Sequence, residues 1–101
     1  QFREGVSFAS QSKWQEAINR WESFYDSSNK KIDKAKAASN IALGYEMLDE
    51  IEKSLEWVEI AQKLFEETVS PSSLERKRIS IYKTEIERRL DNTNKLNMQV
   101  D

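Results

Sequence analysis

The clearest pattern in the chain lies between residues 35 and 65, where apolar side chains recur at steps of three and four in two successive stretches. The first stripe comprises Ala38, Ile41, Ala42, Tyr45 and Leu48, and the second comprises Leu55, Val58, Ala61, Gln62 and Phe65. This spacing places each set on one face of a helix. Small residues on both stripes would let the two helix backbones approach closely, so the pattern predicts an antiparallel helix pair.

A short acidic segment separates these two stripes. Asp49 is followed three residues later by Glu52, which is the spacing of a helix N-cap and its reciprocal partner. We therefore expect a tight turn after Leu48, with Asp49 capping the second helix of the pair.

The region before this pair predicts two further helices. Phe2, Gly5, Phe8 and Ala9 indicate the end of one helix, and Gln11 with Ser12 indicates a turn. Ser12 and Gln15 have capping-box spacing. The stripe of the second helix comprises Trp14, Ala17, Ile18, Trp21, Phe24 and Tyr25, and the polar residues 26–31 follow as a loop. We expect the three tryptophans of the chain to be core residues.

A fifth helix is predicted near the carboxyl end. Ser72 and Glu75 form a capping-box pattern directly after Pro71. The helix should run over about residues 73–97, and its apolar stripe comprises Ile79, Tyr82, Ile86 and Leu90. The low helix propensity of residues 91–94 could end or fray it.

Composition favours a single all-α domain spanning residues 1–101. Only two glycines and one proline occur among the 101 residues, which suits packed helices better than a turn-rich sheet. No apolar run reaches the roughly 18 residues of a membrane span. The chain has neither histidine nor cysteine, so it lacks the commonest general base and the soft metal ligands. We expect no catalytic residues, no cofactor and no metal.

Charge is distributed unevenly along the chain. Eight acidic residues stand against two lysines between Glu46 and Glu67, whereas six basic residues stand against three acidic ones between Glu75 and Arg89. The basic segment could bind the phosphate groups of a nucleic acid, but the net charge of −2 disfavours nucleic acid as a partner. We expect instead that the basic last helix lies against the acidic helix before it.

The segment NIALGYEMLDEIEKSLEWVEIA resembles a tetratricopeptide repeat (TPR), a helix-turn-helix unit of about 34 residues. Ile41, Ala42 and Tyr45 match its first helix, and Leu48 and Ile51 match the positions beside the turn. Leu55, Val58 and Ala61 match its second helix. Ser54 replaces the alanine typical of the family, and Pro71 comes later than the usual proline.

The resemblance implies a TPR-like α-solenoid, with a first repeat at about residues 1–28, a second at about 32–67 and a capping helix. It also implies an inner groove that binds a peptide or helix of a protein partner. The groove residues would be Phe2, Val6, Asn40, Leu43, Glu46 and Met47. Asn40 matches part of the family's cradle for acidic peptides, but Phe2 and Val6 replace the lysine and asparagine of the first repeat. A segment that precedes Gln1 in a longer protein, or the C-terminal tail, could also fill this groove.

The alternative function is that of a structural domain that forms a homodimer. The two copies would associate either through the groove or through a face of the last helix that contains Tyr82 and Ile86.

The chain also resembles the C-terminal repeat region of uncharacterised cell-envelope lipoproteins of Gram-negative gut bacteria. That resemblance implies a fragment of a larger protein in the cell envelope or periplasm, with the cytoplasm as the alternative location.

Overall fold

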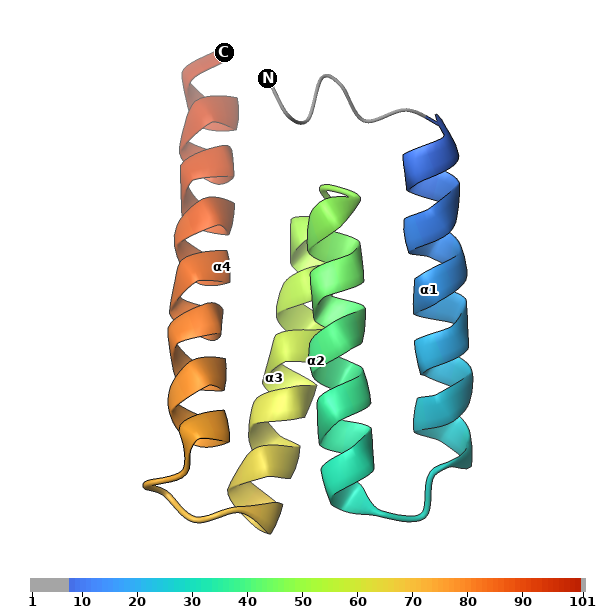
Figure 1. Ribbon diagram of the computed structural model, residues 1–101. Helices are drawn as coiled ribbons and strands as arrows, with labels where there is room; N and C mark the ends of the chain where they lie inside the picture. Colours follow the sequence, from blue (N-terminus) through green and yellow to red (C-terminus); the bar gives the residue numbers. More distant parts are fainter. Residues whose placement is uncertain (1–7, 101) are drawn as a thin grey trace.

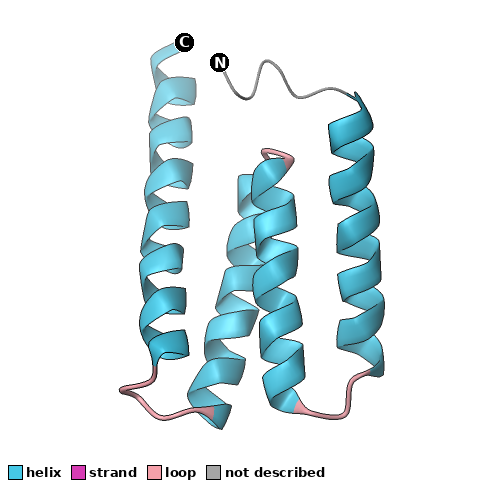
Figure 2. Ribbon diagram, in the orientation of Figure 1, coloured by secondary structure: helices cyan, strands magenta, loops and turns pink. Residues whose placement is uncertain are grey.

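A computed structural model describes residues 8–100 of the chain. These residues form four helices and no strand: α1 (Phe8–Ser27), α2 (Lys31–Met47), α3 (Ile51–Thr68) and α4 (Leu74–Val100) (Figure 2). The all-α prediction is therefore confirmed. The helix predicted at the start of the chain, including Phe2, Gly5 and Val6, lies mostly outside the described residues.

The four helices alternate in direction and lie side by side in chain order (Figure 1). Within the described part of the chain, extensive packing joins α1 to α2, α2 to α3 and α3 to α4. The radius of gyration is 14.8 Å, against about 13 Å for a compact domain of this length. The helices therefore form an open array, in which α1 and α4 are not packed extensively on each other.

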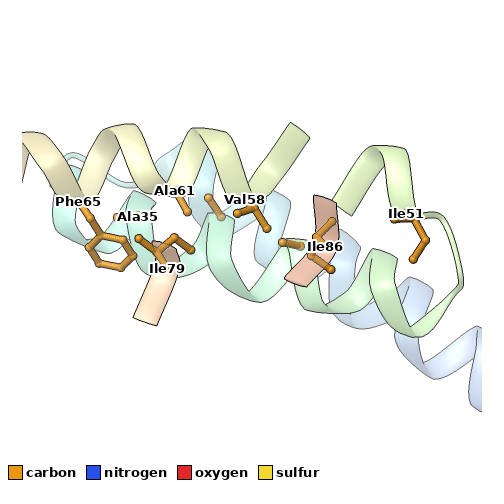
Figure 3. Packing of buried hydrophobic residues seen from close by; sticks show 9 residues of the cluster. Ala35, Ile51, Val58, Ala61, Phe65, Ile79 and Ile86 are labelled. Carbon is orange, nitrogen blue, oxygen red and sulfur yellow. The ribbon is translucent and has the colours of Figure 1, made fainter. Parts of the chain in front are cut away.

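The core lies where α2 crosses α3 and α4 covers the pair. Ala35, Ala38 and Ala42 of α2 pack against Val58 and Ala61 of α3 (Figure 3). Ile79 and Ile86 of α4 complete the same buried cluster. Because alanine side chains are short, the α2 and α3 backbones can approach closely, which confirms the predicted helix pair.

Ser54 is the single fully buried polar residue among those described. Its hydroxyl donates a hydrogen bond of 2.8 Å to the carbonyl oxygen of Ala42. A buried hydroxyl without a partner would be destabilising. The bond removes that cost and links the middle of α3 to α2.

The tight turn predicted after Leu48 is present between α2 and α3, but its capping differs from the prediction. Asp49 adopts a positive φ of 63°, and the backbone N–H groups of Asp49 and Glu50 donate to the carbonyls of Glu46 and Tyr45, at 2.9 Å each. This is a Schellman ending of α2. The N-cap of α3 is Glu50, without a side-chain hydrogen bond, so the predicted Asp49 cap is wrong because Asp49 terminates the preceding helix instead.

Two predictions for the non-helical segments before α2 also differ from the structure. The turn predicted at residues 11 and 12 is wrong, since α1 is continuous through Gln11, Ser12 and Gln15. No glycine or proline lies between Phe8 and Ser27, and each serine costs a helix only a fraction of a kcal/mol. The following loop is also shorter than predicted, with three residues between Ser27 and Lys31.

The last helix closely follows its predicted range, but its cap differs from the prediction. Ser73, rather than Ser72, provides the cap, because its hydroxyl accepts a hydrogen bond from the Arg76 backbone N–H at 3.3 Å. The helix also continues through residues 91–94, although their low helix propensity could have ended it. An ion pair of 3.1 Å between Lys95 and Asp91, one turn apart, spans this segment.

Candidate partner-binding site

The crossing of α1 and α2 determines the shape of the candidate site. Gly44 of α2 faces Ile18 of α1, and both residues are buried. A Cβ atom at position 44 would lie 2.5 Å from Ile18 Cγ1 and 3.5 Å from Trp21 Cζ3. The absence of a side chain at Gly44 therefore lets α1 approach α2 and places Trp21 at the edge of the crossing.

Beside this crossing is an open depression of about 530 Å³, the α1–α2 depression. Its lining is mostly apolar, and its residues are Ser10, Lys13, Trp14, Ala17, Trp21, Asn40 and Leu43. Trp14 and Trp21 are partly exposed, and Leu43 is 40% exposed. Large apolar side chains thus face solvent from two adjacent helices.

A second depression of about 330 Å³, the α2–α4 depression, lies on the other side of Asn40. Its residues are Lys36, Ser39, Asn40, Phe65, Glu75, Arg78, Ile79 and Tyr82. Its lining is more polar, with two cationic and one acidic side chain. Asn40 is common to both depressions, so an apolar and a charged surface adjoin on this side of α2.

Glu46 takes part in a hydrogen-bond network between α2 and α4. Its two carboxylate oxygens accept hydrogen bonds from the Tyr82 hydroxyl at 2.7 Å and from Arg89 Nη1 at 2.5 Å. Arg89 Nη2 lies 3.5 Å from Asp49 Oδ1. Burial, followed by the adjacent Glu46 carboxylate, raises the pKa of Tyr82. These bonds fasten α4 to the end of α2.

The structure separates the four described residues among the six predicted to line the groove. Asn40 and Leu43 lie together in the α1–α2 depression, whereas the Glu46 carboxylate is bonded to α4. Met47 is partly buried and lines neither depression. Phe2 and Val6 lie outside the described residues.

Three residues of the depression were assigned by sequence to the core side of a helix: Trp14, Ala17 and Trp21. A signal was present in the width of the apolar stripe of α1, which spans about 120° of the helix at 3.6 residues per turn. Ile18 at one margin of the stripe is fully buried, whereas Phe24 at the other margin is 51% exposed. Of the three tryptophans, Trp57 packs on the core cluster and meets Tyr25 edge-on at 5.3 Å.

The predicted charge complementarity between the last two helices is present only in part. Helix α4 packs on α3, but the one ion pair between them in the described part of the chain joins Lys83 to Glu59 at 4.0 Å. Arg89 turns to α2 instead, and Arg88 pairs with Glu85 on its own helix. The contact between α3 and α4 is therefore mainly apolar.

Within residues 8–100, no helix is long and apolar enough to cross a membrane. The same residues contain no group of three or more carboxylates placed to hold a metal ion.

Comparison with known proteins gives a family without an assigned activity. No curated protein and no solved structure matches the chain. The sequence model of the family described as "Domain of unknown function (DUF6340)" matches residues 3–88. Because this match covers most of the 101 residues, the chain belongs to the DUF6340 family.

Proposed function

We propose that this chain is a non-catalytic protein-interaction module of TPR-like helical repeats, which binds a helix of another protein in the α1–α2 depression. Helices α2 and α3 would form one complete repeat, α1 the second helix of a preceding repeat, and α4 the closing helix. The sequential antiparallel packing of the four helices supports this arrangement. So does the close α2–α3 crossing at small residues, where Ser54 takes the place of the usual alanine.

The observation that carries the function is the exposed apolar lining of the α1–α2 depression. Trp14, Trp21 and Leu43 present large side chains that a partner could remove from water. Burial of apolar surface contributes about 25 cal/mol per Å². Contiguous apolar patches on a protein surface commonly mark sites of interaction.

A helical occupant fits this depression better than a globular surface would. The lining residues of α1 extend from Ser10 to Trp21, about 16 Å of helix at 1.5 Å per residue. Three turns of a partner helix have the same length, and apolar residues at i, i+3, i+4 and i+7 would then contact Trp14, Trp21 and Leu43. Lys13 is the one charged residue of the lining and would favour an acidic side chain at the margin of that helix.

Selection from a displayed library of helix-forming peptides, with large apolar residues at i, i+3, i+4 and i+7, tests the proposal. The selected peptide should shift the fluorescence of Trp14 and Trp21. The substitution Leu43→Glu should weaken its binding at least about tenfold, because a carboxylate would be buried in an apolar contact. The control Lys63→Glu, on the exposed face of α3, should bind like the wild type.

Circular dichroism should show the same helix content in all three proteins, because Leu43 and Lys63 are both exposed. Failure to select any peptide would contradict the proposal. Equal affinity of the wild type and Leu43→Glu would contradict it too, because the contact would then lie elsewhere.

A further inference from the structure

Helix α4 has an outward face that no described part of the chain covers. Ile79 and Ile86 point into the core, whereas Ile81 is 70% exposed and Leu74 is 56% exposed. Leu74 and Ile81 are seven residues apart and therefore lie on the same face of the helix. The face opposite to the core thus carries two exposed aliphatic side chains.

Three charged residues share this outward face. Lys77 lies one turn before Ile81, Glu85 one turn after it, and Arg88 seven residues after it. All three are exposed. Arg88 pairs with Glu85, whereas Lys77 makes no ion pair with any residue that the structure describes. A cation and an anion therefore stand at equal distances on the two sides of Ile81.

The charges on this face of α4 are complementary to those on the same face of a second, antiparallel copy. If two α4 helices cross antiparallel with a two-fold axis at Ile81, Lys77 of each copy lies opposite Glu85 of the other. Leu74 of each copy then lies opposite the aliphatic stem of Arg88. A two-fold interface forms each of these contacts twice, which favours a second copy over an unrelated partner.

From this pattern we propose that two copies of the chain associate through the outward face of α4, with Ile81 at the two-fold axis. The contact occupies one face of one helix and is therefore small. Interfaces below about 1,200 Å² in total are typical of weak, transient complexes. The expected species is a dimer whose fraction rises with protein concentration.

This interface differs from the one predicted from sequence. Ile86 is fully buried, and the hydroxyl of Tyr82 is bonded to Glu46. Neither residue can therefore form the open face. The substitutions Tyr82→Glu and Ile86→Glu would disrupt the domain itself, so they cannot report on association.

Sedimentation of the 101-residue chain over a range of concentrations measures the dimer. The substitution Lys77→Glu should weaken association at least about tenfold, because two attractive pairs become repulsive. Adding Glu85→Lys to Lys77→Glu restores opposite charges and should restore association. The control Lys63→Glu changes the net charge equally on α3 and should leave the dimer unchanged. A wild-type monomer up to about 1 mM would overturn the proposal, as would insensitivity to Lys77→Glu.

Cysteine cross-linking locates the axis, because the chain contains no cysteine of its own. Oxidised Ile81→Cys should form a disulfide-linked dimer at a concentration where the control Lys63→Cys stays monomeric. Equal yields from both variants would place the axis elsewhere and refute the geometry. If two copies associated through the α1–α2 depression instead, Leu43→Glu would abolish the dimer. If they associate through α4, Leu43→Glu should leave the dimer unchanged.

Discussion

Substitution of Gly44 by alanine should destabilise the domain, although the same change usually stabilises a helix. In an open helix interior, alanine is favoured over glycine by about 1 kcal/mol. At position 44 the added Cβ would lie 2.5 Å from Ile18 Cγ1 and 3.0 Å from Ile18 Cδ1. Carbon atoms in contact normally lie about 3.5–4.0 Å apart, so α1 and α2 would have to separate or Ile18 would have to leave its preferred rotamer.

The net magnitude follows from these two opposing effects. Overpacking of a core costs about 1–3 kcal/mol. We expect the upper half of that range, because Ile18 is fully buried and its β-branched side chain is stiff. After subtraction of the helix-propensity gain, Gly44→Ala should lower the free energy of unfolding by about 1–2 kcal/mol. A small domain loses roughly 4–8 °C in Tm for each kcal/mol.

Urea unfolding followed by circular dichroism measures this change, and Ser23→Ala provides the matched control. Ser23 is exposed on α1, so its replacement should give only the small propensity gain of alanine. A double-mutant cycle with Ile18→Ala tests the cause. Once the Ile18 side chain is truncated, Gly44→Ala should cost nothing or stabilise the fold. A stabilised Gly44→Ala single variant would refute the close approach of α1 and α2.

Two further predictions concern α4. Ser73→Ala should lower the free energy of unfolding by about 1 kcal/mol through loss of the helix cap, whereas Ser72→Ala should change it by less than about 0.5 kcal/mol; equal effects in urea unfolding would contradict the assignment of the cap. Tyr82→Phe should lower stability near neutral pH by removing the hydrogen bond to Glu46. Because the pKa of Tyr82 is raised in the folded state, the wild type should also lose stability as pH rises above about 10, where the unfolded tyrosine ionises. Unfolding measured from pH 8 to 11 should show that the Tyr82→Phe variant lacks this part of the alkaline slope.

The helices were predictable because their apolar residues follow the helical period in a chain with few glycines and prolines. The stripe of Ile79, Tyr82, Ile86 and Leu90 does face the core. Where a helix begins or ends was harder to predict, since several residues compete for the same role. Asp49 has the side chain of an N-cap, yet its backbone closes the preceding helix with a positive φ. Whether Asp49 ends α2 or caps α3 depends on how the two helices pack, and the spacing of residues along the sequence does not determine this packing.

In the candidate site, too, some residues were predictable from the sequence and others depended on how the helices pack. Asn40 and Leu43 were predicted to line a groove from the resemblance to a repeat motif, and both residues line the α1–α2 depression. The exposure of Trp14 and Trp21 was not predictable, because they share one broad apolar stripe with Ile18, and only the crossing at Gly44 decides that Ile18 becomes buried. The sequence by itself determined the helical class and the core stripes, through the angle of each residue on its own helix. The position and depth at which neighbouring helices cross depend on contacts between distant residues, so only the tertiary structure decided which side chains stay exposed.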